Sequence, residues 1–62
     1  ISGDAELEGV VALVIEQNPK SVADFKAGKQ AALMFLVGQA MKLTKGRANP
    51  ERLNALLREK IL

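Results

Sequence analysis

Helix-breaking residues interrupt this chain at short intervals, and the breaks restrict it to short elements. Asn18-Pro19, Gly28, Gly46 and Asn49-Pro50 divide its 62 residues into four segments. Proline lacks an N–H and fixes its own φ, and glycine readily leaves the helical conformation, so regular elements end at such residues. The chain therefore has room for several short elements but not for one long helix.

Within the segments, apolar residues recur at the spacing of one helix face. A candidate cap at Asp4 favours a first helix. Asn18-Pro19 ends it and can start another, and the capping pattern from Ser21 to Asp24 favours a short second helix. Asn49-Pro50-Glu51 is a strong start for the last helix. Helices are expected at about 5–17, between that capping pattern and Gly28, at 29 to about 45, and at 50–61. This pattern predicts an all-α fold, a small bundle of three main helices plus one short helix, in a single domain that spans residues 1–62.

The helical stripes also predict the core. It consists of Leu7, Val10, Val11, Val14, Ile15, Val22, Phe25, Leu33, Leu36, Val37, Ala40, either Leu43 or Thr44, Leu53, Leu56, Leu57 and Ile61. The third helix is apolar almost all round, because Ala32, Met34, Phe35 and Met41 lie outside its main stripe. Such a helix is expected at the centre of the fold, in contact with neighbours on several sides.

The residue types that are missing from the chain narrow its function. Cys and His are both absent, which removes thiolate nucleophiles, zinc–sulfur sites and the commonest general base. The carboxylates are scattered and form no evident acid–base pair, so no catalytic residue and no metal site are expected here. The longest uncharged run, Gln30 to Met41, has 12 residues and is too short to cross a bilayer. With no signal peptide and no disulfide, a cytoplasmic location is expected.

Charge is divided unevenly along the chain. Residues 1–24 carry a net charge of −4 and residues 25–62 a net charge of +6. Lys42 and Lys45 lie one turn apart near Gly38, and Gly46-Arg47 leads into the start of the last helix. These residues could bind phosphate, although Pro50 removes one backbone donor and Glu51 adds a negative charge there. A solvated charged surface is the competing interpretation.

Phe35 shares a helix face with Lys42 and not with the predicted core. It could pack on the short helix, on a domain outside this chain, or on an RNA base. The chain has only two aromatic residues, so stacking of successive bases is not expected. Any nucleic-acid binding would have to recognise backbone and shape.

Several sequence runs resemble the C-terminal end of the B subunit of the aspartyl/glutamyl-tRNA(Asn/Gln) amidotransferases. They are Gly28-Lys29, the run from Phe35 to Lys42, the run from Thr44 to Pro50, and Leu53-Asn54-Ala55-Leu56-Leu57. The resemblance covers about Val10 to Leu62. One departure lies in the core, where Ala40 stands at a position that is often Val in the family.

The resemblance implies a function that the residues alone do not. The family's full B subunit is part of an ATP- and Mg-dependent ligase that uses glutamine as amido donor and works with the A and C subunits. Its tail is understood to hold tRNA near the elbow. For this chain the resemblance implies a non-catalytic fragment without a cofactor of its own. Residues carried over as tRNA contacts are Lys42, Lys45, Arg47, Lys29, Gly38 and Gln39, whereas Gly46, Asn49 and Pro50 are expected to shape the turn.

Two alternatives stay open at this point. The chain could be the C-terminal half of a free-standing YqeY-like protein, a group that shares this terminal motif. It could also be a helix-packing module that braces a neighbouring domain, with Met34, Phe35 and Met41 at the interface and no direct RNA contact.

Overall fold

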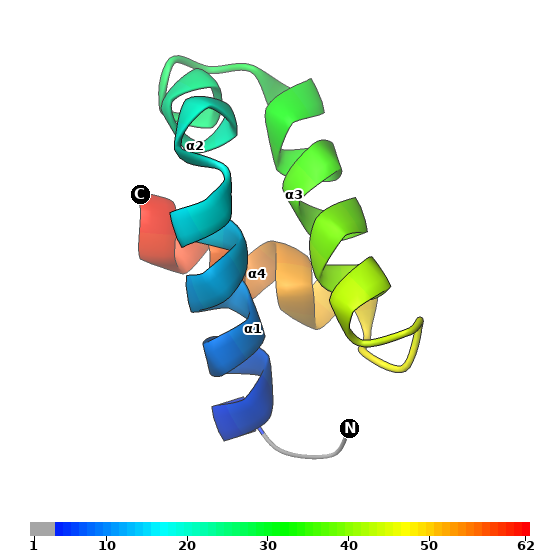
Figure 1. The fold of residues 1–62 in the computed structure, drawn as a ribbon. Helices are drawn as coiled ribbons and strands as arrows, with labels where there is room; N and C mark the ends of the chain where they lie inside the picture. Colours follow the sequence, from blue (N-terminus) through cyan, green and yellow to red (C-terminus); the bar gives the residue numbers. More distant parts are fainter. Residues whose placement is uncertain (1–3) are drawn as a thin grey trace.

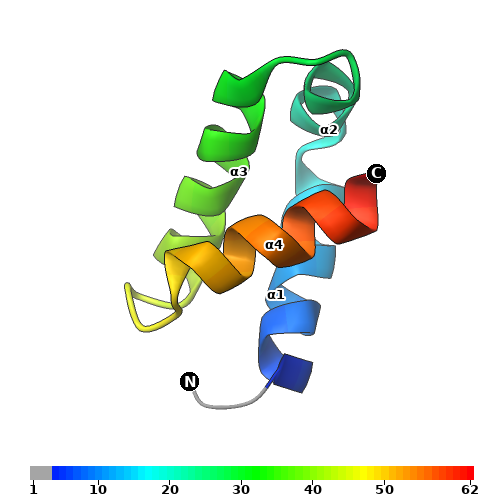
Figure 2. The ribbon, with the colours of Figure 1, turned by 180° about the vertical axis from the view of Figure 1, so that it is seen from behind.

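Each of the expected helices is present in the structure, a computed structural model that describes residues 4–62. The helices are α1 (Asp4–Gln17), α2 (Pro19–Lys26), α3 (Gln30–Leu43) and α4 (Pro50–Ile61), and the described residues contain no strand. Helices α1 and α3 lie side by side with α2 at one end, and α4 crosses behind both in Figure 1 and in front of both in Figure 2. The all-α prediction of three main helices and one short helix is confirmed.

Helix α2 begins earlier than the capping pattern predicted. It starts at Pro19, so Ser21 lies inside the helix and does not cap it. Proline is well suited to the first helical position, where an N–H would have no helical partner. The Asn18 side chain does not cap α2 and donates instead to the carbonyl oxygen of Val14 at 2.9 Å, which closes the end of α1. The cap expected from the side chain of Asp4 lies outside the described part of the structure.

The end of α2 follows the prediction. Gly28 has a φ of 104°, its N–H donates to the carbonyl oxygen of Phe25 at 2.9 Å, and the N–H of Lys29 donates to that of Asp24 at 3.1 Å. This pair of bonds is a Schellman motif, in which a residue at positive φ lets the chain leave the helix. Glycine adopts that conformation without steric cost.

The end of α3 differs from the prediction by one residue. Lys45 has a φ of 56° and takes the left-handed position that was expected of Gly46, which follows with a φ of 75°. The N–H of Lys45 donates to the carbonyl oxygen of Lys42 at 3.2 Å, and that of Gly46 donates to Met41 at 2.8 Å. These bonds form a second Schellman motif, with a lysine where glycine is usual.

The core is shared by all four helices and the loop that joins α3 to α4. Its buried apolar residues are Leu7, Val11, Val14, Phe25, Leu33, Leu36, Ala40, Ala48, Leu53, Leu57 and Ile61. Thr44, not Leu43, takes the last buried position of the α3 stripe, and its hydroxyl donates to the carbonyl oxygen of Met41 at 3.1 Å. That bond satisfies a polar atom which would otherwise be costly to bury.

One face of α3 is not covered by the described residues. Met34 is 73% exposed and Phe35 is 48% exposed, although α3 contacts α1, α2 and α4, which confirms the expectation of neighbours on several sides. The other helices bury the stripe through Leu33, Leu36 and Ala40 and partly cover Ala32, Val37 and Met41 beside it. None of the helices within residues 4–62 has both the length and the hydropathy needed to cross a bilayer.

The start of α4 yields a first stability prediction. Asn49 Oδ1 accepts a hydrogen bond from the N–H of Glu51 at 2.8 Å, so Asn49 caps the helix. We expect Asn49→Ala to lower the free energy of unfolding by about 1 kcal/mol, measured by urea denaturation. Asn54→Ala is the matched control, since it removes the same atoms from inside α4 and should be neutral or slightly stabilising. Equal losses in the two variants would contradict the capping role.

The left-handed lysine yields a second prediction. Lys45→Gly should raise the free energy of unfolding by about 0.5–1 kcal/mol, because glycine adopts positive φ without strain. In thermal melts this corresponds to a rise in Tm of about 4–8 °C per kcal/mol. The same change at Lys42, inside the last turn of α3, should lower stability by about 1 kcal/mol. Changes of the same sign at both positions would show that Lys45 is not strained.

Candidate nucleic-acid interface at the corner between α3 and α4

Three cationic side chains lie close together in the sequence where α3 turns into α4. Lys42 is in the last turn of α3, and Lys45 and Arg47 are in the loop that follows, the yellow loop of Figure 1. All three are exposed. We call them the basic corner. The loop carries no carboxylate, and the first acidic residue after it is Glu51.

The backbone of this loop is fixed at both ends. Thr44 and Ala48 are buried on either side of Lys45, Gly46 and Arg47. Inside the loop, the N–H of Arg47 donates to the carbonyl oxygen of Thr44 at 3.1 Å, in addition to the two bonds that close α3. The positions from which the Lys45 and Arg47 side chains leave the backbone are therefore set by the fold.

The N-terminus of α4 contributes little to anion binding at this corner. Pro50 has no N–H, and the N–H of Glu51 already donates to Asn49. The Glu51 carboxylate also adds a negative charge to this first turn. Any anion held here would depend on the side chains of the basic corner and not on helix donors. Gly46, Asn49 and Pro50 shape the turn in the structure, by positive φ, by capping and by occupying the first helical position.

The remaining predicted contact residues are not all close to the corner. Lys29 is the N-cap residue of α3, at the opposite end of that helix in Figure 1. Lys29 and Lys42 are thirteen residues apart, which corresponds to about 20 Å along a helix axis. Gln39 is half-buried, and Gly38 is exposed one turn before Lys42. The structure thus groups Gly38 with the basic corner and leaves Lys29 apart from it.

Gly38 belongs to a second stripe on α3, opposite the buried one. Ala31, Met34, Phe35, Gly38 and Lys42 follow the spacing of one helix face, and all five are exposed. We call this stripe the outer face of α3. A Cβ built on Gly38 would meet no atom within 4 Å, so the packing of this chain does not require glycine there. The outer face is apolar at its start and cationic where it reaches the corner.

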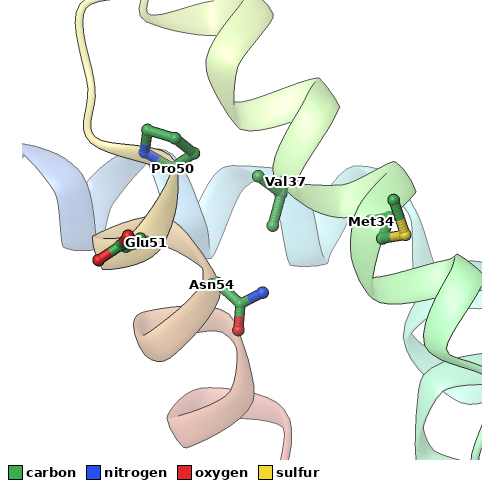
Figure 3. Close-up of a pocket in the computed structure, with 5 residues that line it drawn as sticks. All are labelled: Met34, Val37, Pro50, Glu51 and Asn54. Atoms are coloured by element: carbon green, nitrogen blue, oxygen red, sulfur yellow. The ribbon is translucent and has the colours of Figure 1, made fainter.

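An open groove of about 430 Å³ lies beside the outer face, between α3 and the start of α4. Met34 and Val37 line it from α3, and Pro50, Glu51 and Asn54 line it from α4 (Figure 3). The sequence pattern did not predict this groove. The only indication in the sequence was that Met34, an apolar residue, lies outside the core stripe of α3. None of these five lining residues is a cation, and the Glu51 carboxylate would repel a phosphate. The groove and the basic corner are therefore chemically different surfaces.

The described residues contain no group of three acidic, histidine or cysteine side chains that could hold a metal ion. One exposed ion pair joins α1 to α4, between Glu8 Oε1 and Lys60 Nζ at 3.3 Å. An exposed pair of this kind contributes at most about 1 kcal/mol.

Comparisons with known proteins agree with the resemblance seen in the sequence. A family model described as the GatB domain matches residues 1–61. The chain is 59% identical over 61 residues to the aspartyl/glutamyl-tRNA(Asn/Gln) amidotransferase B subunit of Caldanaerobacter subterraneus subsp. tengcongensis, covering 98% of this chain and 13% of that protein. It is 64% identical over 56 residues to the corresponding B subunit of Carboxydothermus hydrogenoformans, covering 90% of this chain and 12% of that protein. No solved structure matches the chain.

The chain spans about an eighth of the length of the curated relatives it matches, 13% and 12% in the two cases above. Within that span the family model covers nearly every residue, and both relatives share more than half of the aligned residues. The chain belongs to the GatB domain family, as its resemblance to the amidotransferase B subunit predicted.

Proposed function

We propose that this chain is a tRNA-binding, non-catalytic C-terminal appendage of the B subunit of a Glu-tRNA(Gln)/Asp-tRNA(Asn) amidotransferase. In this proposal it holds the tRNA near its elbow while other parts of the enzyme, including the A and C subunits, carry out the ATP- and Mg-dependent amidation in the cytoplasm. The B-subunit name of the relatives supports this proposal over a free-standing YqeY-like protein. The observation that carries it is the basic corner, three exposed cations on a loop that is fixed between two buried residues.

The physical basis of the proposal is phosphate neutralisation. Lys and Arg side chains that contact phosphates release bound counterions, so affinity falls with salt in proportion to the number of contacts. Three contacts would lower affinity by about 20- to 40-fold between 50 and 200 mM salt. The chain has two aromatic residues, and only Phe35 is exposed, so recognition would rest on the shape of the RNA and not on its bases.

A second candidate function is supported by the groove and the exposed Met34. Exposed apolar side chains beside a groove are typical of protein contacts. In this alternative the chain braces a neighbouring domain through α3, and the basic corner is ordinary solvated surface.

The proposal predicts a salt-dependent loss of binding when the basic corner is neutralised. We expect Lys42→Ala/Lys45→Ala to weaken binding to tRNA(Gln) and to reduce the slope of log affinity against log salt by about 1.4–1.8. Binding would be measured by fluorescence anisotropy from 50 to 200 mM salt, with a duplex RNA of equal length for comparison. The matched control is Lys20→Ala/Lys26→Ala, two exposed lysines on α2.

The control should bind tRNA almost as the unaltered chain does, because α2 lies at the other end of α3 from the corner (Figure 1). Equal losses in the two double variants would indicate general charge attraction without a site. No loss in either variant, with equal binding to tRNA and to duplex RNA, would favour the bracing function.

Gly38 provides an independent test of close approach along the outer face. Gly38→Ala should raise the free energy of unfolding by about 1 kcal/mol, because alanine favours the helix and its methyl group meets open space. If RNA packs against this face, the same methyl group should lower tRNA affinity several-fold. Gly9→Ala in α1 is the matched control, since Gly9 is also helical with open space around it. Unchanged tRNA affinity in Gly38→Ala would remove the outer face from the proposed interface.

A further inference from the structure

Lys45 occupies a backbone conformation that suits glycine and not lysine. It is the only non-glycine residue at positive φ among residues 4–62, with a φ of 56°. A side chain in this region crowds the neighbouring backbone, which costs free energy. Gly46, which follows, has a φ of 75°, so the loop contains two successive left-handed positions and glycine occupies only the second. The fold therefore gives no reason for a lysine at this position.

Attraction between a cation and the C-terminus of α3 does not require this placement either. Lys42 already supplies a positive charge inside the last turn, where the helix dipole favours cations. A lysine at Gly46 would also lie near that end of the helix. The dipole thus explains a cation in this region but not its place at Lys45.

The surroundings of Lys45 hold its backbone in the strained conformation. Two hydrogen bonds close the helix around it, from Lys45 N–H to the Lys42 carbonyl at 3.2 Å and from Gly46 N–H to the Met41 carbonyl at 2.8 Å. Thr44 before it and Ala48 after it are buried. Arg47 is held in the same loop by its N–H bond to Thr44 at 3.1 Å. The backbone positions of these two cations are thus fixed before any ligand binds.

Because the backbone beneath both side chains is already fixed, binding of an anion would order only the side chains themselves. A guanidinium group can donate two hydrogen bonds to one phosphate, and an ammonium group adds a compact charge beside it. Neither Lys45 nor Arg47 has a carboxylate within three residues in the sequence. The two cations lie two residues apart in the sequence with no nearby carboxylate, which suits a phosphodiester group shared between them.

We infer that Lys45 and Arg47 bind one RNA phosphate together, and that Lys45 occupies its left-handed position for this contact at the expense of the stability of α3. This inference rests on the proposed tRNA-binding function and makes it more specific. It places the main phosphate contact of the interface in the loop between α3 and α4, and not on the outer face of α3. Lys42 is then an accessory charge whose exact position matters less.

The test is to move the lysine by one residue without changing composition. Lys45→Gly/Gly46→Lys keeps the charge of the chain, and it keeps one lysine at positive φ because residue 46 has a φ of 75°. Its Tm should therefore match that of the unaltered chain. We expect its affinity for tRNA to fall about five- to tenfold, the effect of one lost charge-assisted contact. The salt slope should fall by about 0.7–0.9.

Two further variants separate position from charge. Lys45→Arg keeps a cation on the same backbone position and should bind tRNA within about twofold of the unaltered chain. Lys45→Gly should melt at higher temperature and yet bind tRNA more weakly, because it relieves the strain and removes the contact. Higher stability together with weaker binding is the combination that a merely structural lysine would not give.

The possible outcomes distinguish this inference from the proposed function. If the transposed variant binds tRNA as tightly as the unaltered chain while Lys42→Ala/Lys45→Ala binds weakly, charge alone matters and the inference is wrong. If the unaltered chain does not prefer tRNA over duplex RNA, the proposed function fails and the inference fails with it. If the transposed variant loses affinity with an unchanged Tm, and Lys45→Arg retains it, the inference stands.

Discussion

The reversal of the chain between α3 and α4 is the constraint on which the rest of the structure depends. Burial of Thr44 and Ala48 fixes both ends of the loop, and the cap at Asn49 fixes the direction in which α4 departs. Because α4 crosses both α1 and α3, its direction decides whether Leu53 and Leu57 reach the core. The same loop carries two of the three cations of the basic corner. Fold and candidate interface therefore share one structural element.

Helix α3 has two opposite faces with different surroundings. Its buried stripe holds the bundle together, whereas its outer face and the adjacent groove are left uncovered in the described residues. RNA binding and domain bracing were rival interpretations of the sequence. In the structure the cations that would bind RNA lie at the corner, whereas the groove that would receive a neighbouring domain is lined by Met34, Val37, Pro50, Glu51 and Asn54, with Met34 also part of the outer face. The two functions are thus physically compatible within one small bundle.

Local sequence signals predicted most of the helices, and their errors have identifiable causes. Asn49, Pro50 and the apolar stripe fixed α4 at both ends, because capping and periodicity agree there. The start of α2 was misplaced because two start signals compete, and proline at the first helical position prevailed over the capping pattern at Ser21. For the candidate site, the sequence grouped Lys42, Lys45 and Arg47 at one corner, and the resemblance added Lys29 to them. Lys29 lies apart from the others because α3 separates them along its length.

The sequence by itself determined the number of helices, their amphipathic faces and the resemblance to the amidotransferase B subunit, since these depend on residue order over short distances. The helical stripes also predicted most of the buried residues, and only the tertiary structure decided the remaining cases. Met34 and Ala48 show this, one exposed although apolar and the other buried although small and in a loop. It also placed Lys45, not Gly46, at the left-handed end of α3. The physical reason is that burial and strain depend on how α4 packs across the bundle, and no local pattern encodes that contact.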